Sequence, residues 1–214
     1  MRPHLALAAF LLLASCKGGD HEPRGPALPE APVDVLVDTI GVPHIYAASD
    51  RDAFFAAGYQ MATDRLFQME MVRLRAYGRW TEVHGEAALA DDELARLFDW
   101  AGHGRRDAEK VRAEGPETWA ILTAWVAGVN RRVDEVLAGE APLPWGLGPD
   151  ELDFAPERSS DVDPLVIAKM TSFGNDLTLD REILATLAAR YFSDALAASE
   201  LLRPARPAFT LPPD

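Results

Sequence analysis

The stretch Val33–Gly85, VDVLVDTIGVPHIYAASDRDAFFAAGYQMATDRLFQMEMVRLRAYGRWTEVHG, decides the fold. Its first part, residues 33–46, alternates apolar and polar side chains and turns at Gly41, which predicts a β-hairpin. Ser49 is a suitable N-cap, and the apolar residues after it recur every three or four positions. This spacing predicts one helix of about 25 residues with its apolar side in the core. The apolar series is Phe55, Tyr59, Ala62, Leu66 and Met69.

Several other residues of this stretch admit a structural or a functional interpretation. His44 has no second histidine, cysteine or carboxylate at metal-ligand spacing, so we expect a buried, hydrogen-bonded structural histidine rather than a catalytic one. Asp64 and Arg65 lie beside the apolar side of the helix, where we expect a structural ion pair. Three methionines at helical spacing either fill gaps in the core, which is their commoner use, or line a ligand pocket. They are Met61, Met69 and Met71.

The remainder of the chain is predicted to be helical. A helix is expected to start at Asp91, after glycines at 78 and 85 have ended the long one, and others are expected over residues 116–137, 162–173 and 180–192. A proline at position 116 is acceptable as an early helical residue. The fold class predicted is therefore mainly α with a small N-terminal β-hairpin.

Residues 1–16 have the pattern of a lipoprotein signal peptide. The apolar run Leu5–Ala14 follows Arg2 and is shorter than the ~20 residues that a membrane-spanning helix needs. Leu13-Ala14-Ser15-Cys16 is similar to a bacterial lipobox, and Cys16 is the only cysteine of the chain. We therefore expect lipidation at Cys16. The alternative is an ordinary secreted protein that is cleaved nearby.

The flanking segments differ in composition from the predicted domain. Residues 17–32 are rich in glycine, proline and charge, which is typical of a linker, and residues 196–214 form a proline-rich tail. The folded domain is expected over residues 33–195. Because Lys17 follows the lipobox cysteine, we expect an anchor on the periplasmic side of the outer membrane in a Gram-negative cell.

Composition excludes several classes of function. The chain carries 21 Lys and Arg against 34 Asp and Glu, a formal charge of −13, and no basic cluster, which argues against a nucleic-acid partner. The five histidines are scattered, so a zinc site is not predicted. No Gly-x-Ser-x-Gly elbow occurs. The residues by themselves indicate an exported, helical, acidic protein with one core.

The order of several short motifs resembles the penicillin acylase (penicillin amidase) family of the N-terminal nucleophile hydrolases, and specifically the α chain of its members. The motifs are Gly41-Val42-Pro43-His44-Ile45, the segment Gly58–Met69, Arg73, Gly78-Arg79, Glu82-x-x-Gly85, Gly128-Val129-Asn130 and the segment Met170–Leu187. The resemblance implies the α-subunit portion of an αββα fold. It also implies a precursor that is cut to expose a serine at the start of a β chain.

In the resembling family, that serine attacks an amide and its own α-amino group serves as the base. An amine with a pKa of about 8 is a usable base at neutral pH. The implied substrates are small acylated amides, such as the side-chain amide of β-lactams or acyl-homoserine lactones. No Ser-Asn pair, the usual start of such a β chain, occurs in this sequence. We therefore expect no catalytic residue in this chain and no activity without a β-chain partner.

The resemblance also suggests roles for three residues near the end of the predicted domain. Met170 and Phe173 correspond to α-chain residues that line the acyl pocket, although both could instead be core side chains. Glu182 corresponds to the α-chain glutamate that binds a structural calcium ion together with β-chain oxygens, although it could instead be a solvated side chain. No organic cofactor is implied.

A second hypothesis remains open at this point. The chain could be a non-catalytic outer-membrane lipoprotein that uses the same helical scaffold for binding or assembly.

Overall fold

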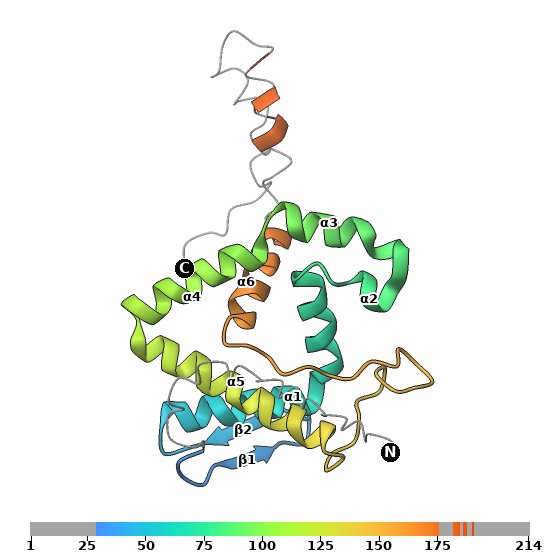
Figure 1. Ribbon diagram of the computed structural model, residues 1–214. Helices are drawn as coiled ribbons and strands as arrows, with labels where there is room; N and C mark the ends of the chain where they lie inside the picture. Colours follow the sequence, from blue (N-terminus) through green and yellow to red (C-terminus); the bar gives the residue numbers. More distant parts are fainter. Residues whose placement is uncertain (1–28, 176–181, 185, 188–189, 191–214) are drawn as a thin grey trace, which may run out of the picture.

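The computed structural model describes residues 29–175, 182–184, 186–187 and 190. The path of the chain from α1 to α5 surrounds helix α6 in Figure 1. The described residues are mainly helical with one small antiparallel hairpin, so the predicted fold class is confirmed. The elements are β1 (Asp34–Val37), β2 (Pro43–Tyr46), α1 (Asp50–Ala76), α2 (Thr81–His84), the 3₁₀ turn η1 (Gly85–Ala88), α3 (Leu89–Leu97), α4 (Trp100–Glu114), α5 (Pro116–Leu137) and α6 (Asp163–Gly174).

The hairpin has the predicted strands, but His44 is exposed rather than buried. Asp38 closes the turn, because its Oδ1 accepts the N–H groups of Ile40 and Val42 at 2.9 Å each. His44 pairs with Leu36 in the register, and both side chains are exposed. The expected burial of His44 is wrong, since alternate residues of a two-stranded sheet face opposite sides. Its Nε2 lies 3.3 Å from Asp38 Oδ2.

Helix α1 begins as predicted and then bends. Ser49 caps it, with its Oγ accepting the N–H of Asp52 at 3.2 Å. Arg65 has non-helical angles, φ −139° and ψ 22°, and the two parts of α1 run in different directions in Figure 1. The expected Asp64–Arg65 ion pair is wrong: Asp64 accepts from Gln60, and Arg65 donates to Gln68. Adjacent residues on a helix do not face each other.

Helices α1 and α5 cross in close contact because each presents a glycine to the backbone of the other. A Cβ at Gly58 would lie 2.1 Å from the carbonyl oxygen of Trp125, and a Cβ at Gly128 would lie 1.9 Å from that of Phe55. Ala62 and Leu66 of α1 then pack against valines of α5 in one buried cluster. The valines are Val129, Val133 and Val136.

Helix α4 was not predicted from the sequence. Asp99 precedes it in a left-handed conformation, φ 48°, and caps it by accepting the N–H of Gly102 at 3.0 Å. Two glycines in the first turns weaken the helical pattern. Gly104 has a packing reason, because a Cβ there would lie 2.8 Å from the backbone nitrogen of Val166 on α6. A second buried cluster forms here from Ala76, Ala95, Trp100 and Val166.

The other helices lie close to their predicted positions. Helix α5 has the predicted bounds, 116–137, and α6 and α3 differ from theirs by one or two residues. Of the helix expected over residues 180–192, the described positions have helical backbone. The signal segment 1–16 with Cys16, most of the linker 17–32 and the tail 196–214 lie outside the described residues. Within the described part, no helix combines the length and apolar character that crossing a bilayer requires.

Candidate functional site

A mostly apolar hollow of about 410 Å³ lies between α1, α5 and the beginning of α6. Met69, Trp125 and Ile167 contribute apolar walls from three different helices, and Glu70 and Arg73 contribute charged groups from α1. Its other lining residues are Met61, Arg65, Leu66, Gln68, Val72, Val129, Ser159, Asp163 and Pro164. A hollow of this size and lining is within the usual range for small-molecule sites.

A second hollow of about 1020 Å³ adjoins the first. The hairpin turn at Gly41–Pro43 and the Pro144-Trp145 segment form two of its sides, and α1 forms another. Both hollows are lined by Met61, Arg65, Leu66 and Gln68. The two therefore meet along the side of α1 on either side of its bend. Met61 and Met69 line the first hollow, although Met69 also packs against the cluster of α1 and α5, and Met71 is buried in the core. A ligand-binding role for the methionines stays a prediction.

A buried ion pair lies beside the first hollow. Arg73 Nη2 donates to Glu70 Oε2 at 2.6 Å and to Glu157 Oε2 at 2.9 Å. Burial raises the pKa of the Glu70 carboxyl, although Arg73 opposes the shift. For Arg73, burial by itself would lower the pKa, but the hydrogen bonds and charges of its two partners outweigh it and raise the pKa. The guanidinium therefore stays charged inside the protein.

Glu157 connects this pair to a second arginine. Arg79 donates to both carboxylate oxygens of Glu157, at 2.9 and 3.0 Å, and to both of Glu82 at 2.7 Å. The hydrogen bonds from Arg79, together with the charge of Arg73, lower the pKa of Glu157 to about 2. The network ties the loop that carries Glu157 to the end of α1.

Arg73 retains one donor without a partner. Its Nε–H is buried and makes no hydrogen bond, and Arg73 lines the first hollow. The side chain is only 8% exposed. A buried donor without an acceptor costs about 1–3 kcal/mol.

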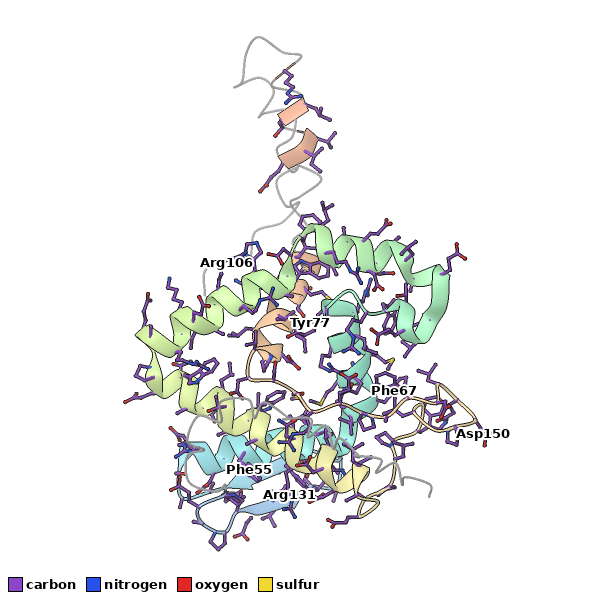
Figure 2. The ribbon with its side chains drawn as sticks, in the orientation of Figure 1. Phe55, Phe67, Tyr77, Arg106, Arg131 and Asp150 are labelled. Atoms are coloured by element: carbon purple, nitrogen blue, oxygen red, sulfur yellow. The ribbon has the colours of Figure 1, made fainter. Side chains whose placement is uncertain are left out.

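The segment before α6 forms a polar wall of the first hollow. The hydroxyl of Tyr77 donates to Asp163 Oδ1 at 2.7 Å, and the Ser160 hydroxyl also donates to this carboxylate. Burial and the hydrogen bond to Asp163 raise the pKa of Tyr77 to about 12. Tyr77 lies at the end of α1 on the side of α6 (Figure 2). Within the described part of the chain, no serine hydroxyl is hydrogen bonded to a histidine.

The residues predicted to line an acyl pocket lie further along α6. Met170 and Phe173 are half-buried and pack against the second cluster, and the ring centroid of Phe173 is 4.3 Å from that of Phe98 and 5.7 Å from that of Trp100. The first hollow is instead lined by Pro164 and Ile167, nearer the start of the helix. The pocket role of Met170 and Phe173 stays a prediction.

Glu182, another predicted site residue, lines neither hollow. The side chain of Glu182 is exposed, and the described residues contain no group of three or more His, Cys, Asp or Glu that could hold a metal ion. Calcium takes about six to eight oxygen ligands, so the residues described do not by themselves fit a calcium site. Cys16 lies outside the described residues.

Sequence reasoning missed the Glu70–Arg73–Glu157 network. The i, i+3 spacing of Glu70 and Arg73 was a usable signal for the first pair. Nothing local indicated Glu157, which is 84 residues from Arg73.

Comparison with known proteins gives consistent matches. The family model for penicillin amidase matches residues 32–207. The chain is 45% identical over 118 residues to penicillin acylase 2 proenzyme of Pseudomonas sp. strain SE83, covering 55% of this chain and 14% of that protein. It is 33% identical over 170 residues to penicillin G acylase of Escherichia coli, covering 77% of this chain and 20% of that protein.

An acyl-homoserine lactone acylase, QuiP of Pseudomonas syringae pv. tomato, is 32% identical over 206 residues, covering 90% of this chain and 24% of that protein. Among solved structures, a chain of the thermostable penicillin G acylase from Alcaligenes faecalis superposes with a TM-score of 0.63 at 25% identity. That match covers 86% of this chain and 97% of the other. The chain thus spans 14 to 24% of the length of the three curated relatives named here.

Proposed function

The chain belongs to the penicillin amidase family, and from that premise we propose that it is the α-chain portion of an acylase-like amidohydrolase. The observation that carries the proposal is the match to 97% of one chain of a penicillin G acylase, whereas only 20% of the length of the Escherichia coli relative is matched. The proposed substrates are linear amides of the β-lactam side-chain or acyl-homoserine lactone type, because both kinds of acylase occur among the relatives.

In the proposed reaction, the nucleophile comes from a companion β chain. The amine at the start of that chain takes the proton from the hydroxyl of the same serine, the oxygen attacks the amide carbonyl, and the C–N bond breaks as the proton passes to the leaving nitrogen. Water then hydrolyses the acyl-serine ester, which releases the carboxylic acid and restores the serine hydroxyl. This chain contributes no group to those steps. We propose that it is inactive alone, which agrees with the lack of a Ser-Asn pair in its sequence.

The role proposed for this chain is to build the walls around the companion's nucleophile. Met170 and Phe173 would present apolar surface to the acyl group from the later turns of α6. Glu182 would supply one carboxylate to a calcium ion whose other ligands come from outside the described residues. Lipidation of Cys16 would hold the assembly at the periplasmic side of the outer membrane.

The test is an amidase assay with a matched comparison. A chromogenic phenylacetyl anilide should be turned over by the chain purified together with its Ser-initiated companion, and not by this chain purified alone. The coding sequence downstream of Asp214 identifies that companion if the two are encoded together. Turnover by the pure single chain would overturn the assignment of the nucleophile. A stable monomer from cells that make no companion would favour the non-catalytic lipoprotein instead.

A further inference from the structure

We propose that Tyr77 is a positioning residue for the reaction: its hydroxyl fixes the start of α6 through Asp163, and the position of α6 then decides which acyl groups fit beside that helix. The inference rests on the proposed function, in which Met170 and Phe173 of α6 face the acyl group. It adds the residue that holds this apolar wall in place, and the property of the substrate that depends on it, which is the size of the acyl group.

Asp163 holds the start of α6, which has no side-chain cap. Val162 occupies the N-cap position, and a valine has no group that could accept hydrogen bonds from the first N–H groups of the helix. Asp163 is buried, and its carboxylate accepts from the Tyr77 hydroxyl at 2.7 Å, from the Ser160 N–H at 3.1 Å and from the Ser160 hydroxyl. Ser160 belongs to the same segment of the chain, whereas Tyr77 follows the last residue of α1 and lies on the side of α6 (Figure 2). Of these three donors, the Tyr77 hydroxyl is therefore the one that ties α6 to another helix.

Two further polar contacts hold the segment before α6, at Glu157 and at Ser159. Both of these residues precede the helix, whereas Asp163 is its first residue. Removal of the Tyr77 hydroxyl therefore leaves the segment attached to α1 and α5 and frees only the start of the helix. The expected consequence is a shifted α6 rather than a detached one.

The contact of α6 with α4 at Val166 is the point about which a displaced helix turns. Val166 is fully buried, and a Cβ at Gly104 would lie 2.8 Å from its backbone nitrogen, so the backbone has little room to move there. Val166 lies three residues after Asp163 and seven residues before Phe173. Because a helix is stiff and rises about 1.5 Å per residue, a shift at Asp163 becomes a shift about twice as large at Phe173.

Phe173 converts such a shift into a change of acyl selectivity. Its ring is half-buried and packs against Phe98, with ring centroids 4.3 Å apart, so part of its surface is left for a ligand. A displacement of about 1 Å in a group that contacts the substrate can change a rate about 100-fold. A shift of α6 changes the space beside this ring, and acyl groups of different size are then affected unequally. We therefore expect the Tyr77 hydroxyl to act on the discrimination between acyl groups.

The test compares two tyrosines that make the same kind of contact. Tyr77→Phe removes only the hydroxyl that binds Asp163. Tyr59→Phe is the matched control, because Tyr59 is also half-buried and its hydroxyl also donates to a carboxylate, that of Glu135 at 2.9 Å, which belongs to α5 rather than α6. In the complex with the companion, Tyr77→Phe should change the ratio of kcat/KM between phenylacetyl and longer acyl amides by about fivefold or more. Tyr59→Phe should lower the melting temperature by a similar amount and change that ratio by less than about twofold.

A double substitution tests whether the hydroxyl acts through Asp163. In an Asp163→Ala background, Tyr77→Phe should cause no further change in the ratio of kcat/KM, because the acceptor of the hydroxyl is already absent. The same change in both backgrounds would show that Tyr77 acts by another route and would overturn the proposal.

Hydrogen exchange of the complex tests the position of α6 without an assay of activity, and it is independent of whether Asp163→Ala folds. The N–H groups of Leu165 and Val166 donate to the carbonyl of Val162 in the first turn of the helix, at 3.0 and 3.1 Å. Exchange at these two amides should be at least about threefold faster in Tyr77→Phe than in the wild type, and unchanged in Tyr59→Phe. Equal exchange in the two variants would overturn the proposal.

The failures of the two proposals are distinguishable. If the wild-type complex hydrolyses acylated amides and Tyr77→Phe has the same ratio of kcat/KM as Tyr59→Phe, Tyr77 is not a positioning residue and the function stands. If the wild-type complex hydrolyses none of the acylated amides, the proposed function is wrong and the exchange measurement decides on Tyr77. Faster exchange in Tyr77→Phe alone then supports its hold on α6, and equal exchange in the two variants refutes it.

Discussion

Asn130 on α5 and Ser159 in the segment before α6 exchange two hydrogen bonds: Asn130 Nδ2 donates to the Ser159 carbonyl at 2.8 Å, and the Ser159 N–H donates to Asn130 Oδ1 at 2.7 Å. A primary amide suits this arrangement because it presents a donor and an acceptor side by side. The pair fixes Ser159 at the wall of the smaller hollow.

Asn130→Ala should therefore lower stability by about 2 kcal/mol, because it leaves a backbone donor and acceptor without partners. The expected result is a lower melting temperature, measured on the chain purified with its companion. Asn175→Ala is the matched control, since Asn175 is exposed, and should shift it by less than about 2 °C. Equal losses of stability from the two substitutions would show that the hydrogen bonds between Asn130 and Ser159 do not stabilise the fold.

The close crossing of α1 and α5 makes a stronger prediction. Gly58→Ala and Gly128→Ala each place a Cβ within about 2 Å of a backbone oxygen of the other helix, so the helices must separate. We expect a loss of about 3 kcal/mol or more for each. Gly174→Ala is the control, because nothing lies within 4 Å of its added Cβ. Thermal unfolding or secreted yield measures the effect, and wild-type stability of either crossing variant would refute this packing.

Glu157 gives the prediction on pH. Its pKa is about 2 in the folded protein, below the ordinary glutamate value, so its ionised form stabilises the fold above the unfolded pKa of about 4.3. That contribution is lost as the pH falls from about 4.3 towards 2. Glu157→Gln should thus be less stable than the wild type at pH 7, and the difference should shrink through this window. The magnitude will be modest because the side chain is 42% exposed.

Melting temperatures from pH 3 to 7 measure this difference, with Glu109→Gln on the exposed side of α4 as the control. A difference that stays constant with pH would show that Glu157 acts through packing rather than charge.

Several features of the fold were predictable because their signals are local. Helix α5 has its predicted bounds, since Pro116 suits the first turn and its valines recur at helical spacing. Helix α4 was not predicted because Gly104 weakens the local helical pattern. The glycine is required by close packing against Val166, which lies 62 residues later in the sequence and on another helix. A glycine that weakens a helix in isolation can be required by a neighbour that the local pattern does not contain.

The candidate site was less predictable than the fold for the same reason. Arg65 has non-helical angles, so the two parts of α1 do not form the single straight helix that the periodicity predicts. Glu157, which accepts hydrogen bonds from Arg73 and Arg79, lies in a loop that is distant in the sequence. Charged residues in an acidic sequence have many possible partners, so only the packed structure identifies which are paired. The family motifs indicated where to look, because Arg73, Arg79 and Glu82 were among them.

Lipidation of Cys16 is predicted from the sequence alone. Cells grown with an alkyne-tagged palmitate should incorporate the label into the wild type and not into Cys16→Ser, and the variant should shift from the membrane fraction to the soluble fraction. Ser15→Ala is the control for disturbance of the neighbouring position, and should remain labelled. If Cys16→Ser loses the label but stays in the membrane fraction, the protein has an anchor other than this lipid.

Phe173 allows the proposed acyl pocket to be separated from simple core packing. Its ring packs against Phe98, so replacing either one with leucine removes similar aromatic contact from the same cluster. If Phe173 also faces the acyl group, as proposed, Phe173→Leu should change the ratio of kcat/KM between phenylacetyl and longer acyl amides by about tenfold, in the range typical of one altered apolar contact. Phe98→Leu should lower the melting temperature by a similar amount and leave that ratio unchanged, because α3 and its following residue do not belong to the proposed pocket. Both ratios are measured on the assembled complex at a temperature where each variant is folded. Parallel losses of stability with no change in either ratio would assign Phe173 to the core alone.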